Sequence, residues 1–138
     1  MSYILQTQTT SFKKELYTGI HDLSTDVLKI ALYTASANLN AATTVYSTTN
    51  EVTGGGYVAG GAVLTGVTIS SEDYTAYVDF ANVVFGAAVT ARCALIYNVT
   101  QGNKSIAVLD FGSDKTSSNF TITMPANTAS AALIRSSN

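Results

Sequence analysis

Hydrophobic residues near the start of the chain recur at the spacing of one helix face. The apolar stripe runs through four positions separated by four, four and three residues: Phe12, Leu16, Ile20 and Leu23. Ser11 stands just before the stripe, where its hydroxyl can cap the first turn. The pattern predicts a helix over Ser11–Leu23, with its apolar stripe packed across a sheet.

The rest of the chain alternates between apolar and polar residues, which is the period of strands. Val27–Thr34 has one fully apolar face and one mixed face, as in a sheet with one side in the core. Thr90–Val99 is the strongest strand pattern, and the turn residues Gly102-Asn103 predict a hairpin with Ser105–Phe111. Further strands are predicted at Tyr57–Leu64, Val67–Ser70, Tyr74–Phe80, Val83–Phe85, Phe120–Met124 and Ala129–Arg135.

About eight short strands at regular spacing, with one helix near the start, indicate a mainly β fold. We expect a single domain over residues 1–138, built as an antiparallel β-sandwich or jelly roll. A turn at Ser71–Asp73 and a polar loop at Gly112–Ser118 are expected between strands.

Two segments stand apart from the strand pattern. Residues 1–8 alternate loosely, and residues 1–10 form either an N-terminal arm that reaches a neighbouring subunit or a terminus that is frayed or docked on its own domain. Residues 35–56 are a long loop excursion, rich in Ala, Asn, Thr and Ser, without a core pattern; such excursions are usually functional, partner-bound or mobile. Gly54–Gly56 ends it with residues suited to positive φ, and Gly60-Gly61 predicts a bulge or a close approach of two backbones.

Composition and charge narrow the classes of function. Charged residues make up 12% of the chain and the formal net charge is −2, so we expect no nucleic-acid partner. Polarity comes instead from 20 Thr, 14 Ser and 9 Asn, which suits sheets and intersubunit contacts. No apolar run approaches the roughly 20 residues of a membrane helix, so we expect no membrane partner. The first residues lack the features of a secretory signal, which predicts synthesis in the cytoplasm.

No group of residues has the spacing of a catalytic or metal site. His21 is expected at the C-terminal end of the helix, beside Asp22 and near Asp26, which are too few ligands for a metal. No serine or cysteine nucleophile can be matched with a base. Glu72, with the acidic residue that follows it, is interpreted as part of a solvated turn, and the single cysteine, Cys93, as a buried inert thiol. We therefore expect no enzyme, no cofactor and no metal.

Four phrases of the sequence resemble a group of small virion proteins of tailed bacteriophages and prophages. They are SFKKELYTGIHDL (Ser11–Leu23), LKIALYTASANLNAATTVYSTTNEVTGGGYVAGGAVLTG (Leu28–Gly66), ARCALIYN (Ala91–Asn98) and AVLDFGSDKTSSNFTITMP (Ala107–Pro125). The resemblance covers nearly the whole chain and keeps the order of the phrases. Within that class, small β-sandwich proteins often act as head decoration or cement proteins.

The resemblance implies a non-enzymatic capsid decoration protein on the surface of the virion, made in the cytoplasm of the host bacterium. Its partners would be the major capsid protein, at junctions of capsid subunits, and further copies of itself in a dimer or trimer. The alternatives are a tail, connector or host-adhesion component of the virion and, more remotely, a carbohydrate-binding or hydrolytic domain. The absence of Trp counts against a sugar site. The predicted contact residues lie in the N-terminal arm and the excursion: Tyr3, Leu5, Thr48, Thr49, Asn50, Glu51 and Tyr57.

Overall fold

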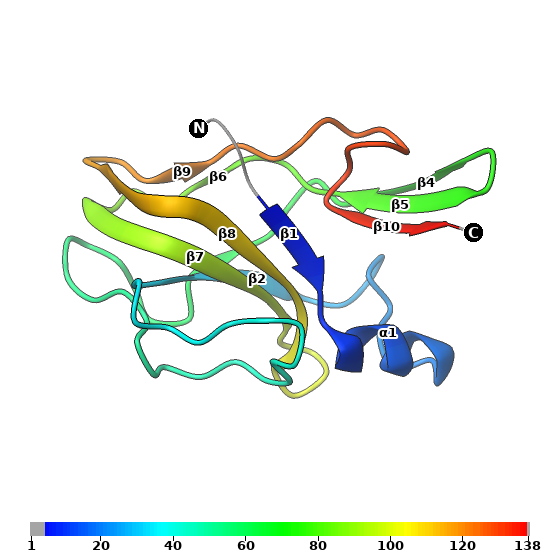
Figure 1. The fold of residues 1–138 in the computed structure, drawn as a ribbon, viewed down its shortest axis with the longest axis horizontal. Helices are drawn as coiled ribbons and strands as arrows, with labels where there is room; N and C mark the ends of the chain where they lie inside the picture. Colours follow the sequence, from blue (N-terminus) through cyan, green and yellow to red (C-terminus); the bar gives the residue numbers. More distant parts are fainter. Residues whose placement is uncertain (1–4, 138) are drawn as a thin grey trace.

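The computed structural model describes residues 5–137, and Figure 1 shows layers of antiparallel strands with one short helix. The helix α1 is Thr10–Tyr17. The strands in chain order are β1 Leu5–Gln8, β2 Leu28–Tyr33, β3 Ala62–Val63, β4 Thr68–Glu72, β5 Thr75–Asp79, β6 Val83–Val84, β7 Val89–Asn98, β8 Lys104–Ser117, β9 Thr121–Ile122 and β10 Ile134–Ser137. The predicted class, mainly β with antiparallel sheets and one helix, is confirmed, with ten strands among the described residues.

The strands form two layers around a buried core. The larger layer is a five-stranded sheet in the order β1-β8-β7-β2-β3, antiparallel at every pairing. The second layer consists of the three-stranded sheet β10-β5-β4 and the two-stranded sheet β6-β9 (Figure 1). Ile30, Ile96 and Leu109 of the first layer share one buried cluster with Val78 and Ile122 of the second. This is the face-to-face packing of a sandwich.

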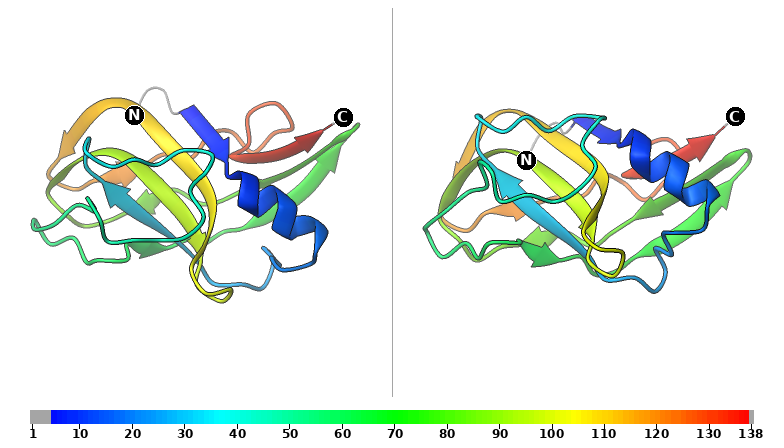
Figure 2. Two further views of the ribbon diagram at one scale, coloured as in Figure 1. Left: turned by 60° about the horizontal axis from the view of Figure 1, so that its bottom comes forward. Right: turned by 90° about the horizontal axis from the view of Figure 1, so that it is seen from below.

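The five-stranded sheet is also buried on its other face. Tyr33, Cys93 and Leu95 belong to a second buried cluster, against which Leu39 and Tyr46 pack. The cover comes from residues 34–61, called the covering loop below, which Figure 2 shows crossing the sheet. The excursion therefore lies on the sheet, and its few apolar contacts are too widely spaced in the sequence to form a periodic pattern.

Helix α1 begins earlier and ends earlier than predicted. Thr9, not Ser11, is the N-cap, since its hydroxyl accepts a hydrogen bond from Phe12 N at 3.3 Å. The helix ends at Tyr17 because Gly19 takes a left-handed φ of 75°, which stops the helical hydrogen bonding. The end of the helix depends on backbone dihedral angles, which the spacing of the apolar residues does not encode.

The early end of the helix breaks the predicted apolar stripe. Phe12 is buried within the helix, whereas Leu16 is 40% exposed. Leu23 and His21 are also buried, but both belong to the segment after the helix. The prediction that His21 lies at the helix C-terminus is therefore wrong.

Strand β8 is twice as long as its apolar pattern suggested. The predicted hairpin with β7 is confirmed, but β8 continues to Ser117, so the polar loop predicted at Gly112–Ser118 is wrong. After a register shift, the polar half of β8 pairs with the start of β7, with Val89 opposite Ser117 and Ala91 opposite Lys115. Most of this half is exposed, so its residues carry no apolar signal.

Three other boundaries also differ from the predictions. The strand expected at Tyr57–Leu64 is reduced to β3, because the glycines before it take positive φ. The β4–β5 turn lies at residues 73–74 and not at Ser71–Asp73. The last strand begins at Ile134 and not at Ala129, because residues before it form turns.

The described part of the N-terminal arm docks on its own sheet. Strand β1 pairs antiparallel with β8, with Leu5 opposite Asp110. This supports the self-docked alternative for residues 5–8. Tyr3, the other predicted contact residue of the arm, lies outside the described residues.

Candidate functional site

One buried carboxylate, Glu51, ties the covering loop together. Glu51 is only 6% exposed. Its Oε1 accepts a hydrogen bond from the Tyr46 hydroxyl at 2.6 Å, and its Oε2 accepts from the Tyr57 hydroxyl at 2.5 Å and from Gly60 N at 2.8 Å. Hydrogen bonds to an ionised group are stronger than neutral ones, and together they offset the cost of burying the charge. Three points of the loop thus converge on one side chain.

The tyrosines of this cluster also join the loop to the five-stranded sheet. The Tyr57 hydroxyl accepts a hydrogen bond from Leu32 N at 2.9 Å, and the Tyr97 hydroxyl donates to Gly60 O at 2.6 Å. The Tyr46 ring stacks on the Tyr97 ring with centroids 4.5 Å apart. Burial and then the hydrogen bond to the carboxylate raise the pKa of Tyr57, and burial raises the pKa of Tyr97 to about 12. Both hydroxyls are therefore protonated donors at neutral pH.

The tip of the covering loop, residues 47–50, presents uncharged polar groups and is held in place through Ser47. The Ser47 hydroxyl accepts a hydrogen bond from Thr49 N at 3.1 Å, and the Ser47 carbonyl accepts one from the Tyr33 hydroxyl at 2.6 Å. Three polar residues of the tip are exposed: Thr48, Thr49 and Asn50. Such a surface can contact a partner without desolvating a charge.

The predicted contact residues of the loop fall into two groups. Thr48, Thr49 and Asn50 lie at the surface, and their contact with a partner stays a prediction. Glu51 is buried, and its carboxylate is bonded inside the loop, so little of it is exposed for contact with a partner. Tyr57 is half-buried and its hydroxyl is bonded inside. A lone acidic residue in a polar stretch resembles a solvated one, so the sequence carried no signal for this role.

The arm touches the covering loop only near its end, where Thr10 N donates to Ala41 O at 2.8 Å, whereas Leu5 lies far from Glu51. A row of paired residues crosses the sheet from one edge to the other: Leu5, Asp110, Cys93, Tyr33 and Glu51. Adjacent strands are about 4.8 Å apart, so the backbones at the two ends of this row are separated by about 19 Å. A partner that contacts both Leu5 and the strand position of Glu51 would have to span the whole sheet.

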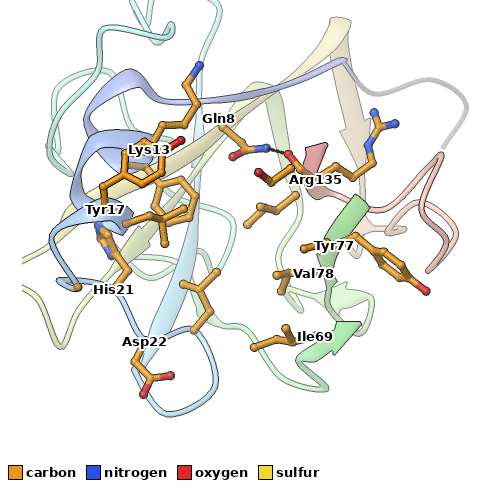
Figure 3. Close-up of a pocket in the computed structure, with 16 residues that line it drawn as sticks. Gln8, Lys13, Tyr17, His21, Asp22, Ile69, Tyr77, Val78 and Arg135 are labelled. Atoms are coloured by element: carbon orange, nitrogen blue, oxygen red, sulfur yellow. Dashed lines mark hydrogen bonds between the residues drawn. The ribbon is translucent and has the colours of Figure 1, made fainter. Parts of the chain in front are cut away.

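A groove of about 570 Å³ opens between α1 and the sheet β10-β5-β4 (Figure 3). Its floor is apolar and is formed by Phe12, Leu23, Ile69, Val78 and Ile134. Its rim carries polar residues, among them Lys13 and Asp22, and the Gln8 amide donates to Arg135 O at 2.6 Å. The groove can accept an apolar side chain. No local pattern in the sequence predicted it, because its walls come from both ends and the middle of the chain.

His21 lines the groove and is fixed by two hydrogen bonds. Its Nε2 lies 2.8 Å from Glu15 Oε1, and its Nδ1 lies 3.0 Å from Asn98 Nδ2. The same Asn98 amide nitrogen donates to Asp26 Oδ2 at 2.8 Å, and Asn98 Oδ1 accepts from Gln101 N at 3.2 Å. These partners fix the amide orientation, so Nδ1 of His21 accepts and Nε2 carries the proton that it donates to Glu15.

Hydrogen bonds around Asn98 also lower the pKa of Asp26. Burial acts to raise the pKa of Asp26, but hydrogen bonds from Asn98, the Asp22 backbone and Gln101 outweigh it, so the pKa lies below its usual value. A carboxyl group with a lowered folded-state pKa stabilises the fold above its unfolded pKa. That stability is lost as the pH falls through the folded pKa.

Replacing Asn98 with alanine should lower the free energy of unfolding by about 2 kcal/mol at neutral pH, since it unpairs the partners of a buried amide. It should also return the pKa of Asp26 toward its usual value. The variant should then lose less stability than the wild type when the pH falls below about 4. Urea titrations at about pH 7 and about pH 3 would measure both effects. An acid-dependent loss equal to that of the wild type would contradict the assignment.

Within residues 5–137, no three His, Cys, Asp or Glu side chains are grouped to hold a metal ion. Cys93 is buried, as predicted, and burial raises the pKa of its thiol to about 11. Arg92 and Asp110 form a partly exposed ion pair at 3.1 Å on the sheet. Within the same residues, no helix has the length and apolar character needed to cross a membrane.

Comparison of the chain with protein-family models, with curated proteins and with solved structures found no match in any of the three. The functional conclusion therefore rests on the residues of this chain, its sequence resemblance and its surface.

Proposed function

We propose that this chain is a non-enzymatic structural protein of a tailed bacteriophage virion that decorates the outside of the capsid. It binds at junctions of the major capsid subunits and stabilises the expanded shell. The observation that carries the proposal is the resemblance to small phage virion proteins, which runs through the sequence from Ser11 to Pro125. The three comparisons neither support nor oppose it.

The covering loop supports this role physically. A long polar loop in free solution would be a mobile segment, and binding would have to order it at an entropic cost. Here Glu51 and its tyrosine partners order the loop beforehand, so its exposed tip is preorganised. A protein that binds only the expanded shell shifts the equilibrium toward that shell by mass action. Many symmetric copies then multiply a modest contact energy.

The tip of the covering loop gives a direct test. Changing both Thr48 and Thr49 to arginine should weaken binding to shells that lack this protein by roughly tenfold or more, because charged side chains would have to be desolvated. Asn50 is left unchanged because its φ of 62° suits asparagine. Co-sedimentation with purified expanded shells, read on a gel, measures the binding.

A matched control separates the tip from the added charge. Changing Thr65 and Thr123, which are exposed elsewhere on the surface, to arginine adds the same charge and should leave shell binding within about twofold. Equal binding by the tip variant and the wild type would refute the tip as the contact surface. Separation of virions into heads and tails tests the wider proposal: recovery with tails, or in a few copies only, would favour the tail or connector alternative.

A further inference from the structure

Strand β4 is an open edge of the three-stranded sheet. The order of that sheet is β10-β5-β4, and no strand in the described part of the chain pairs with the outer side of β4. All five of its residues are exposed, and Ile69 is 54% exposed although it is apolar. Figure 1 shows the β4–β5 hairpin extending beyond the five-stranded sheet. The backbone groups on this edge are therefore free to pair.

The sequence of β4 carries one charged residue, Glu72 at its end, and lacks the other devices that normally protect an edge. Native edge strands carry charged side chains, above all lysine, or proline or a bulge, which discourage pairing with another chain. The strand Thr68–Glu72 has no lysine or proline, and it pairs with β5 without a register shift. The opposite edge of this sheet differs, because the Gln8 amide binds Arg135 O of β10 at 2.6 Å. Strand β4 is thus the edge left available.

The tight turn sets which backbone groups point outward. Residues 73–74 connect β4 to β5, and Glu72 pairs with Thr75 directly beside the turn. Residues that flank a two-residue turn exchange hydrogen bonds, and bonded and non-bonded pairs then alternate. Ile69 and Ser71 therefore direct their N–H and C=O groups to the open edge.

We propose that β4 binds β4 of a second copy of this chain, antiparallel, about a two-fold axis at Ser70. Ser70 then faces its own counterpart, Ile69 and Ser71 exchange backbone hydrogen bonds across the axis, and Thr68 faces Glu72. The two three-stranded sheets become one continuous six-stranded sheet. A two-fold interface uses the same patch on both subunits, which this strand satisfies.

Charge favours a second copy in this orientation. Antiparallel pairing places the acidic turns, Glu72 and Asp73, at opposite ends of the seam and sets each Glu72 against a neutral residue. Parallel pairing would place the two Glu72 carboxylates side by side. Pairing also covers Ile69, which lies in register with Val78 and Ile134 on the face of the groove. The two grooves would then meet across the axis.

This inference does not depend on the proposed capsid role, and it selects a dimer from the dimer or trimer that the resemblance implies. Sedimentation equilibrium of the full chain over a range of concentrations should show a monomer–dimer equilibrium. Ser71→Pro removes one outward N–H group and should raise the dissociation constant at least tenfold, with far-ultraviolet circular dichroism confirming the fold. A wild-type monomer at every concentration, or a trimer, would overturn the proposal.

Disulfide trapping tests the register independently. The two Ser70 positions are directly opposite, with Cβ atoms about 4.5–5.5 Å apart, so Ser70→Cys should form a covalent dimer on mild oxidation. Glu72→Cys is the control, because its two copies would be about 14 Å apart along the seam and should not cross-link. The native Cys93 is buried and should not interfere. Cross-linking of both variants alike, or of neither, would overturn the two-fold register, whatever the outcome of the shell-binding assay.

Discussion

Gly61→Ala is expected to lower the free energy of unfolding by about 4 kcal/mol, of which about 3 come from steric overlap and about 1 from backbone strain. A Cβ atom at Gly61 would lie 2.6 Å from the carbonyl carbon of Ile30 and 2.8 Å from Cα of Ala31, and closer still to Ile30 O. These are backbone atoms of β2, which is paired in the sheet and cannot move away easily. Urea denaturation measures the loss.

A substitution at a second glycine distinguishes the cost of steric overlap from the cost of backbone strain. Gly54 has a φ of 82°, against 83° at Gly61, and a Cβ there would meet nothing within 4 Å. Gly54→Ala should therefore lose only the roughly 1 kcal/mol of left-handed strain. A similar loss in the two variants would show that the close approach to β2 does not restrict this position.

Glu51→Ala is expected to destabilise the protein by about 3 kcal/mol, because it leaves two tyrosine hydroxyls and one backbone N–H without their charged acceptor. The effect should be concentrated in the covering loop. Amide hydrogen exchange should speed up at Gly60 more than in β7 or β8, because the Gly60 N–H donates directly to the carboxylate. Urea denaturation gives the total loss.

Two further substitutions define what Glu51 contributes. Glu51→Gln keeps one acceptor oxygen for Tyr57 and Gly60, so it should lose only about 1 kcal/mol. Asp114→Ala removes an exposed carboxylate and should change stability by no more than about 0.5 kcal/mol. If alanine at position 51 were as harmless as alanine at position 114, the carboxylate of Glu51 would not hold the loop.

The elements that the sequence predicted well are those with a local signal. The apolar faces of β2 and β7 are buried, so the alternation of apolar and polar residues in the sequence located both strands. The turn Gly102-Asn103 predicted the β7–β8 hairpin, because both residues adopt positive φ there. The glycines before β3 pointed to a close backbone approach, which Gly61 confirms.

The candidate interaction surfaces depended on contacts between distant residues. The groove joins α1 near the start of the chain to β10 near its end, so no window of sequence contains it. The second half of β8 is polar, and only pairing with β7 makes it a strand. Of the predicted contact residues, those at the loop tip are exposed and Glu51 is buried, and their contact with a partner stays a prediction.

The sequence by itself determined that the chain forms antiparallel strands with one helix near its start, since these follow from residue period, glycine and turn chemistry. Tertiary structure decided where the covering loop lies and what holds it. Glu51 acquires its role only when Tyr46, Tyr57 and Gly60 are brought around it by the sheet beneath. A carboxylate in water needs no such partners, but a carboxylate removed from water must find them in the fold.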